Sequence, residues 1–360
     1  MLMPTNPLVS IITPSYNHAD FLEYTIQSVL KQEYEPIEYI LVDGGSTDGS
    51  LEIIRRYADR FSWWISEPDK GQADAINKGF REAKGEIVAW LNSDDLYMPH
   101  AVSRAVSVFQ EIKDLGMVYG DALTIDATGK PIKKLTFDHW GLTELIRFRI
   151  ICQPTVFMHR MKLEKSGLLD PAYHFMLDHH LWIRLAQFSP VHYLNLNQDR
   201  YNPIAAARHH PTSKNVAQAR EFGHEIMRIL EWMENQSNLS PLIARNPRQV
   251  YGGAYRLYAR YMLDGNMPWE ALKLYGQAFM TWPGYASRHW HRMIYAALCL
   301  MRLNGPIDQL RNKSSNHKRR LLANELTGNR VQNSDRVLND QTSKIESIDL
   351  KNWPGLCFEF

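Results

Sequence analysis

The feature that most constrains the fold is a regular alternation of short apolar runs and amphipathic segments over the first 114 residues. The apolar runs are rich in β-branched residues and indicate buried strands, while the segments between them carry apolar residues at helical spacing. The predicted strands are 8–13, 37–42, 61–66 and 86–91, and the predicted helices are 19–31, 51–60, 72–83 and 99–114. This alternation predicts a mainly parallel α/β sheet flanked by helices. Ser50 is expected to cap the second helix and Pro99 to open the fourth.

Polar and acidic residues follow each of these strands. Ligands of open α/β sheets bind outside the carboxyl ends of the strands, so the loops at those ends are expected to meet. Their polar residues are Tyr16, Asn17, Asp43, Asp69, Asp74, Asp94 and Asp95. Glycines in the loops allow close approach to a ligand, and helix starts offer N–H groups to phosphate. The spacing matches neither Walker A nor the dinucleotide-binding glycine motif, which argues against those two enzyme classes.

Two adjacent carboxylates, Asp94 and Asp95, end the fourth strand. Two ionised carboxylates side by side repel each other, so keeping both charged costs free energy unless a positive charge lies nearby. Mg²⁺ and Mn²⁺ commonly bridge one or two carboxylates to substrate phosphates, which favours a metal site. The alternative is an ordinary turn with solvated aspartates, because Asp and Asn favour turns. These residues alone leave both interpretations open.

Composition narrows the function classes only modestly. The 360 residues, 44% hydrophobic and 22% charged, fit a soluble globular protein of one or two domains. A net charge of +2 gives no indication of nucleic acid as a partner, and none is expected. Three widely spaced cysteines form neither a disulfide framework nor a zinc pattern and suit a reducing interior. With no secretory signal and no long apolar run, we expect a cytoplasmic protein without a membrane span.

Beyond residue 116 the pattern is less regular. Further strands are predicted at 117–120, 122–127, 131–135, 155–159 and 191–196, and helices at 162–167 and, beginning near Asp178, within 175–185. Gly167 is expected to end the first of these helices. Asp178 stands where the second begins, so it is either an N-cap or a functional carboxylate. The segment 202–214, with Arg208, His210 and Lys214, is predicted to be a loop, either solvated or a lid over phosphate.

Five motifs carry a resemblance to a known family. They are SIITPSYN at 10–17, VDGGSTDG at 42–49, GQADAINKG at 71–79, LNSDD at 91–95 and DHHLW at 178–182. In this order, over residues 8 to about 215, the chain resembles the family 2 glycosyltransferases, which use nucleotide sugars. The resemblance implies the GT-A fold, a Rossmann-like, mixed and mainly parallel sheet flanked by helices. A C-terminal α-helical extension would follow it.

The resemblance implies a nucleotide site in the first three loops. The positions that would contact the nucleotide are Pro14, Tyr16, Asn17, Asp43, Asp74 and Lys78. Pro14 and Tyr16 would line the nucleobase pocket, and Asp43 would lie in the loop that reads the base or the ribose. Asp74 would sit beside the nucleotide, with Lys78 one helical turn later.

The resemblance also implies the metal and catalytic groups. Asp95 is the first choice for direct coordination of Mn²⁺ or Mg²⁺, and Asp94 for the ribose or a second metal contact. Asp178 would be the catalytic base. Arg208 and His210 would belong to a flexible loop that meets the diphosphate.

Three positions depart from the family pattern. Gly44 stands where the family often has a second acidic residue that meets the base, so a preference for uridine does not follow. Asn92 stands where the metal motif often begins with Asp. His180 replaces an acid often found in the helix of the catalytic base, a change that bears on acceptor binding.

Together these features imply an inverting, metal-dependent glycosyltransferase. Sugar transfer from a nucleoside diphosphate leaves negative charge on the diphosphate, which a divalent cation neutralises. The acceptor hydroxyl needs a base, and one catalytic carboxylate suits inversion, whereas a retaining glycosidase uses a close pair. The expected donor is a UDP, GDP or dTDP sugar. The resemblance, rather than any residue, implies that the acceptor is a saccharide or lipid-linked saccharide, in the synthesis of a polysaccharide or glycoconjugate of the bacterial cell envelope.

Two other functions remain open. A sugar nucleotidyltransferase also holds metal on carboxylates, but it would need a glycine-rich basic loop after the first strand, where this chain has PSYN at 14–17. A non-catalytic nucleotide-sugar-binding scaffold would act through the C-terminal helices. The joint presence of Asp95 and Asp178 argues against the scaffold.

The chain is expected to divide into a catalytic domain at 1–215, a helical extension at 216–304 and a polar, disordered tail at 305–360. Helices predicted at 250–263 and 269–280 faintly resemble one tetratricopeptide unit, expected to pack on the catalytic domain rather than on a partner. The amphipathic segment 288–303 is expected to be an ordinary packed helix, with a membrane surface as the alternative. The basic run 313–320 is solvated by default, or touches anionic lipid in a peripheral contact at the cytoplasmic face.

Overall fold

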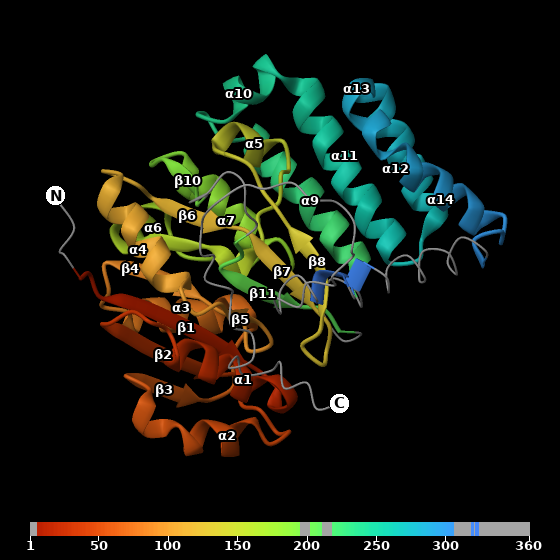
Figure 1. Cartoon of the computed structure of the whole chain (residues 1–360). Helices are drawn as coiled ribbons and strands as arrows, with labels where there is room; N and C mark the ends of the chain where they lie inside the picture. The colour runs from red at the N-terminus through yellow and green to blue at the C-terminus, as the bar shows by residue number, and fades with distance from the viewer. Residues whose placement is uncertain (1–5, 195–201, 211–217, 306–317, 320, 324–360) are drawn as a thin grey trace, which may run out of the picture.

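The computed structural model describes residues 6–194, 202–210, 218–305, 318–319 and 321–323. An α/β body carries a group of helices along one side (Figure 1). The predictions for Lys214, for most of the basic run 313–320 and for almost all of the tail lie outside the described residues.

The body is built on a seven-stranded sheet with the order β10-β6-β9-β4-β1-β2-β3. The strands are β1 (Val9–Ser15), β2 (Ile37–Asp43), β3 (Trp63–Ser66), β4 (Ile87–Trp90), β6 (Met117–Gly120), β9 (Phe157–His159) and β10 (Val191–Leu194). The first four are parallel, whereas β9 runs antiparallel to β4 and β6. The prediction of a mixed, mainly parallel sheet is confirmed.

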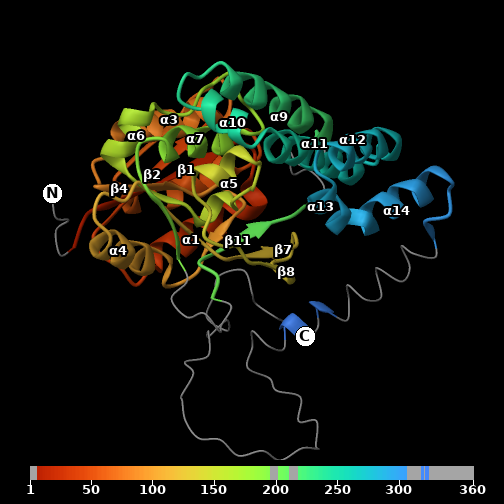
Figure 2. The same ribbon diagram turned by 90° about the horizontal axis from the view of Figure 1, so that it is seen from above.

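Helices cover both faces of this sheet (Figure 2). On one face lie α1 (Ala19–Leu30), α2 (Ser50–Arg56) and α4 (Ala101–Glu111), and on the other α3 (Gln72–Glu82), α6 (Arg160–Ser166) and α7 (Leu177–Ala186). Successive residues of β1 alternate between the two cores, since Ile11 packs with α1 and Ile12 with α3. The predicted end of α6 at Gly167 is confirmed, with φ +78°.

The expected cap of the second helix is wrong. α2 begins at Ser50 itself, and the capping position is held by Gly49 at φ +100°, where a side chain would be strained. The Ser50 hydroxyl instead donates to the Asp48 carboxylate at 2.6 Å. The helix is shorter than predicted and is followed by a single 3₁₀ turn, η1 (Ala58–Arg60).

A second sheet of four strands has the order β5-β11-β7-β8. Its strands are β5 (Leu96–Tyr97), β7 (Ala122–Ile125), β8 (Pro131–Leu135) and β11 (Ala205–Arg208). The predicted loop at 202–214 is therefore wrong at β11, whose small residues are buried between β5 and β7. Because Met98 donates to the Ile204 carbonyl, the chain stays extended past β5, and α4 begins at Ala101 rather than at Pro99.

The remaining elements are mostly helical. They are α5 (Leu142–Ile146), η2 (Gln153–Thr155), α9 (Ala219–Glu234), α10 (Ser240–Arg245), α11 (Pro247–Asp264), α12 (Pro268–Thr281), α13 (Pro283–Ala286), η3 (Ser287–His289) and α14 (Trp290–Leu300). Apolar residues of α9 and α11 belong to the same core as α3 and α7. The Arg256 guanidinium on α11 donates to the Phe148 carbonyl at 3.0 Å. The prediction that this helix pair packs on the preceding part of the chain is confirmed, because residues of α11 and α12 share a core with α3 and α7.

The last helix is packed on one side only. α14 packs along α12, with Ala296 fully buried and Met293 and Tyr295 partly buried against the same core, so the prediction of a packed helix is confirmed. Its other side is exposed at Trp290 and Ile294. Within the described residues, no helix combines the length and the apolar character needed to cross a membrane.

Candidate functional site

The loops that follow β1 to β4 meet at one edge of the sheet, as predicted, because these strands are neighbours in the order β4-β1-β2-β3. Asn17 joins the first two loops. Its side-chain oxygen accepts from the Thr47 N–H at 2.8 Å, and its own N–H donates to the Ser46 hydroxyl at 2.8 Å. Asn17 therefore holds this edge in shape.

Asp43 organises the loop after β2. Its side chain is fully buried and accepts from the N–H groups of Gly45 and Ser46, at 3.1 and 2.9 Å. The hydroxyls of Ser46 and Ser66 donate to it as well. The loop itself thus satisfies this carboxylate, which closes the turn instead of facing outward.

Asp69 fills the space left by the missing side chain of Gly44. A methyl group at Gly44 would overlap the Asp69 carboxylate and touch the Tyr16 ring. Asp69 is fixed there because its other oxygen accepts from the Gly71 N–H at 2.8 Å, while Tyr16 is 61% exposed. A carboxylate from another loop thus lies where a side chain at 44, often the second acid of the family pattern, would be. Asp69 was predicted only as one of the polar residues in these loops, and nothing in the sequence indicates that it lies over Gly44.

Asp74 and Lys78 brace the loop after β3. Lys78 pairs with Glu67 at 2.8 Å and with Asp74 one turn earlier on α3 at 3.7 Å. The hydrogen bond to Glu67, followed by the charge of Asp74, raises the pKa of Lys78. Asp74 also accepts from the Lys70 N–H at 3.1 Å. Pro14, by contrast, is buried within β1 beneath this edge.

Asp95 is a buried anchor for β11. Its carboxylate accepts from the Arg208 N–H at 2.9 Å and from the Asn92 amide at 3.3 Å. Burial, followed by the charge of Asp94, raises the pKa of Asp95 well above its usual value. Asn92 also receives a hydrogen bond from Gln72 and donates one to Gln153, at 2.8 and 3.0 Å. The amide at 92 thus links three elements where the family pattern has a carboxylate.

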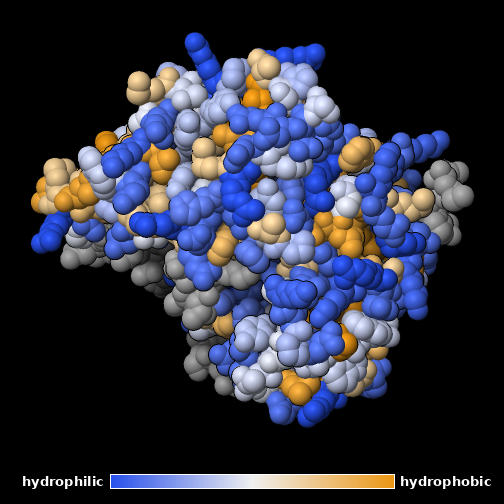
Figure 3. Space-filling view, turned by 180° about the vertical axis from the view of Figure 1, so that it is seen from behind, coloured by the Kyte–Doolittle hydropathy of each residue, from blue (hydrophilic) through white to orange (hydrophobic). Residues whose placement is uncertain are grey.

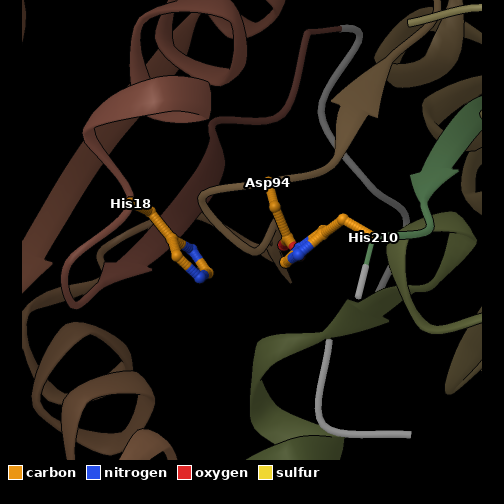
Figure 4. Close-up of side chains that lie close together, drawn as sticks. All are labelled: His18, Asp94 and His210. Atoms are coloured by element: carbon orange, nitrogen blue, oxygen red, sulfur yellow. The ribbon is translucent and has the colours of Figure 1, made fainter. Parts of the chain in front are cut away.

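Asp94 meets two imidazoles. One nitrogen of His18, one of His210 and a carboxylate oxygen of Asp94 all lie within 4.8 Å of one another. His210 approaches Asp94 at 3.1 Å, and the three side chains point toward one space (Figure 4). The His18 ring also hydrogen bonds to the Ser93 hydroxyl at 2.7 Å. Two imidazoles and a carboxylate are a donor set that suits Mn²⁺ and other first-row divalent metals. Sequence reasoning missed His18, although it directly follows the first motif.

Arg208 lies on β11 and is largely buried rather than in a flexible loop. Its guanidinium donates to the Asp94 carbonyl at 2.8 Å and to the Asp126 and Ala127 carbonyls at 3.1 and 3.0 Å. It also stacks over the Phe21 ring at 4.9 Å. Arg208 therefore fixes the main chain that carries Asp94, and β11 delivers His210 to the same place.

Asp178 lies within the first turn of α7. The capping position belongs to Met176, so the N-cap interpretation of Asp178 is wrong. Its carboxylate accepts from the His179 N–H at 2.7 Å. Burial raises the pKa of Asp178 to about 6, and the charge of Glu225 acts in the same direction. A carboxylate with this pKa is a stronger base than an ordinary one and is still ionised at neutral pH.

Glu225 holds the segment that leads into α7. This buried side chain of α9 accepts from the N–H groups of His174, Phe175 and Met176, at 2.7, 2.8 and 2.7 Å. Three donors on one carboxylate fix the start of α7, and with it Asp178. Sequence reasoning missed Glu225, because nothing in a helical segment 50 residues downstream marks a partner of this loop.

One ring contact ties α7 to the strand that leads into the acidic motif. Trp182 of α7 stacks on Trp90 of β4, with ring centroids 5.1 Å apart. Burial first, and then the charges of Asp95 and Asp178, raise the pKa of the Cys152 thiol. The helix that carries Asp178 therefore packs against the end of the strand that the acidic motif follows.

His180 lies among aromatic rings. Its ring lies against those of Tyr173 and Trp232, at centroid distances of 4.1 and 4.4 Å, and is almost fully buried. The departure from the family pattern at this position is therefore a packing feature between α7 and α9.

The sequence matches known proteins over this part of the chain. The model of glycosyl transferase family 2 matches residues 10–164. A protein of Haemophilus influenzae described as a glycosyltransferase is 34% identical over 182 residues, which cover 48% of this chain and 71% of that protein. One from Rickettsia felis is 32% identical over 203 residues, covering 52% of this chain and 33% of that protein. The chain thus spans only about a third of the length of that second relative.

Two solved structures share the fold. TarS of S. aureus, residues 1 to 349 in complex with UDP-GlcNAc, superposes with a TM-score of 0.54 at 16% identity, covering 81% of this chain and 87% of that one. The mannosyltransferase PcManGT of Pyrobaculum calidifontis, in complex with GDP-Man and Mn²⁺, gives 0.53 at 18% identity, covering 85% and 90%. At these identities the likeness is one of fold, and the prediction of the GT-A fold is confirmed.

Proposed function

Because the chain belongs to glycosyl transferase family 2, we propose that it moves a sugar from a nucleoside-diphosphate sugar to an acceptor hydroxyl with inversion at the anomeric carbon. One observation carries the proposal. Asp178, a carboxyl with a raised pKa, lies on α7, which packs on β4 through Trp182 and Trp90, and Asp94 with its two imidazoles lies in the loop that follows β4. A base and a candidate cation site are the equipment this reaction needs.

The nucleotide is assigned to the edge formed by the first three loops. The base would rest against the exposed Tyr16 ring, beside the Asp69 carboxylate that lies over Gly44. Pro14 and Asp43 would support this surface from below, while Asn17 and the pair of Asp74 and Lys78 would hold the loops around it. Asp69 is thereby added to the residues that we assign to the nucleotide site.

The cation, Mn²⁺ or Mg²⁺, is assigned to Asp94, His18 and His210. This donor set fits a divalent metal, and its imidazoles favour Mn²⁺ over Mg²⁺. Asp95 would support the site from behind, because its two oxygens already hold β11 and Asn92. When bound, the cation supplies charge neutralisation for the departing diphosphate. Arg208 would keep Asp94 in place rather than meet the diphosphate itself.

Asp178 is assigned as the base. Its carboxylate accepts the proton of the acceptor hydroxyl while that oxygen bonds to the anomeric carbon and the bond from this carbon to the diphosphate oxygen breaks. The electron pair of the broken bond leaves with the nucleoside diphosphate. Attack opposite the leaving group inverts the centre, and no second catalytic carboxylate is required.

The acceptor class and the domain roles complete the proposal. The acceptor is a saccharide or lipid-linked saccharide in the synthesis of a surface polysaccharide or glycoconjugate. Residues 1–215 would be the catalytic domain and 216–304 a helical extension that completes its core, since α9 and α11 share apolar contacts with α3 and α7. α9 also provides Glu225, which holds the segment before Asp178.

The test is calorimetric titration of the purified chain with UDP, GDP and dTDP, each with Mn²⁺ and with a chelator. Tight, metal-dependent binding of one nucleotide is expected, and it identifies the donor class. Asp94→Ala should lose the metal-dependent part of the affinity, whereas Glu52→Gln on the exposed side of α2 should retain it. Absence of binding to all three nucleotides would overturn the assignment of this edge as a nucleotide site.

A further inference from the structure

Exposed large apolar side chains are concentrated at the end of the helical extension. Thirteen are exposed in the described part of the chain, and eight of them fall in the segment 269–303. These are Trp269, Phe279, Met280, Trp290, Ile294, Leu300, Met301 and Leu303. Apolar colour marks the left edge of the molecule in Figure 3, where α14 ends. A concentration of this kind marks an interaction surface rather than the scattered apolar residues of an ordinary exterior.

Three exposed residues form a stripe along α14 and the residue that directly follows it. Ile294 lies four positions and Met301 eleven positions after Trp290, so at about 100° per residue all three fall on one side of the helix. They are 61%, 49% and 57% exposed. Ala296, the buried residue of α14, points to another side and packs into the core shared with α12. The stripe therefore faces solvent.

The charge around the stripe has one sign. Between Glu270 and Asp308 the sequence contains no acidic residue. The cationic residues in this interval are Lys273, Arg288, Arg292 and Arg302, joined by His289 and His291. Within the described residues, one carboxylate from outside the interval pairs here, namely Asp264 with Arg292 at 3.6 Å. The surface is thus both apolar and basic.

A cavity of about 490 Å³ opens beside this surface, between the end of α11 and α14. Arg292, His291 and Asp264 line its polar part, and Ile294 and Leu298 its apolar part. Two guanidiniums pair with Asp264, that of Arg260 at 3.3 Å and that of Arg292 at 3.6 Å. Positive charge therefore exceeds this carboxylate, which suits a phosphate group with an attached chain.

We propose that α12 to α14 dock this protein on the surface of a lipid bilayer that carries anionic headgroups. The stripe of Trp290, Ile294 and Met301 would enter the boundary of the acyl chains, and the arginines and histidines beside it would meet the lipid phosphates. An amphipathic helix with Trp and aliphatic residues on one side and cations beside them is the sequence type that lies in this interface. The proposal goes beyond sugar transfer and holds whatever the donor is.

A second copy of the chain fits this surface poorly. In a two-fold interface the same patch meets itself, so Arg288 and Arg302 would face cations of the other copy with no acid in the interval to offset them. A nucleic acid would satisfy the cations but would leave the apolar stripe in water. A bilayer with anionic lipid satisfies both features, because phosphate and acyl chain lie next to each other.

The test is flotation of the full chain with vesicles of phosphatidylcholine alone and of phosphatidylcholine with phosphatidylglycerol. Binding is expected with the anionic vesicles, and high salt should weaken it. Ile294→Glu and Met301→Glu should each reduce the apparent affinity by about tenfold or more, since each removes apolar contact and adds repulsion. Met161→Glu is the matched control, because Met161 is 66% exposed on α6, far from the patch in sequence.

Three results would overturn the proposal. One is absence of binding to both kinds of vesicle. Another is an equal loss of binding in Met161→Glu and Ile294→Glu, which would make the contact non-specific. The third is a dimer in light scattering that Ile294→Glu converts to monomer while vesicle binding stays unchanged, which would assign the patch to a second copy. Nucleotide titration of each variant reports whether the fold is retained, independently of lipid binding.

Discussion

At the scale of single residues, Asp178 combines a raised pKa with a position fixed from outside its own helix. We expect Asp178→Asn to retain nucleotide affinity and to lose about 10²-fold or more in turnover, because an amide cannot accept the acceptor proton. Calorimetry and a transfer assay on the same preparation separate the two quantities. Unchanged turnover would remove Asp178 from the role of base.

The pH dependence of turnover follows from the same carboxyl. The pKa of Asp178 is about 6, so the active, ionised form is lost as the pH falls through 6. Glu225→Gln removes a negative charge that contributes to this raised pKa, so the acidic limb of the kcat profile should move to lower pH. Glu221→Gln, on an exposed position of the same helix, is the control. Identical limbs in both variants would leave Glu225 with a packing role alone.

Residue identities near the site were only partly predictable. Asp94, Asp95 and Asp178 stand in contiguous motifs, so the sequence brings them to notice without a structure. His18, Asp69 and Glu225 act through partners 50 or more residues away or through a neighbour's missing side chain. Such relations exist only once the chain has folded, and no local pattern encodes them.

At the scale of elements, α7 carries a second acid-sensitive feature. Burial lowers the pKa values of His179 and His180 to about 3, so both are neutral in the folded chain. The unfolded chain binds these protons below about pH 6.5, so folding stability is present above that pH and falls as the pH drops toward 3. Each histidine contributes a loss on the order of 1 kcal/mol per pH unit in this window.

His180→Phe tests this directly. Phenylalanine keeps the ring contacts with Tyr173 and Trp232 but cannot take up a proton. The urea midpoint of the variant should therefore fall less than that of the parent between about pH 7 and pH 5. Asp178, whose pKa shift acts in the opposite direction, is present in both proteins and drops out of the comparison. Parallel slopes would contradict the assignment.

The elements themselves were predictable where periodicity is strong. β1 to β4 and the helices α1 and α3 match their predicted ranges closely, because alternating burial leaves a clear pattern in each segment, whereas α2 is shorter than predicted. β11 was not predicted, because its three alanines do not favour a strand over a loop. The segment forms a strand through its pairing with β5 and β7 on either side. The exposed side of α14 was not predicted for another reason. The spacing of apolar residues in an amphipathic helix is the same whether a protein core, a membrane or water contacts its apolar side.

At the scale of the whole molecule, the helical extension and the α/β body share one core, a relation that helix periodicity alone does not reveal. Gly253 of α11 lies so close to Arg147 that an added methyl group would overlap its carbonyl. We expect Gly253→Ala to destabilise the protein by about 1–3 kcal/mol through this overlap. Gly276→Ala on α12, where space is open, should instead be neutral or stabilise by about 0.5–1 kcal/mol.

Thermal unfolding of both variants measures the difference. A single transition that shifts downward in Gly253→Ala would mean that body and extension unfold together. Two separate transitions, of which Gly253→Ala shifts only the one that belongs to the helical extension, would contradict a shared core.

The close packing of Asp69 on Gly44 has a consequence for how such a chain can change over generations. A side chain introduced at 44 meets the Asp69 carboxylate, so Asp69 must turn away to make room for it. The two positions are therefore epistatic, because the acid that occupies this space excludes the other. If Asp69 reads the nucleobase, a substitution at 44 displaces that contact, and the history of donor choice in such a lineage depends on both positions together.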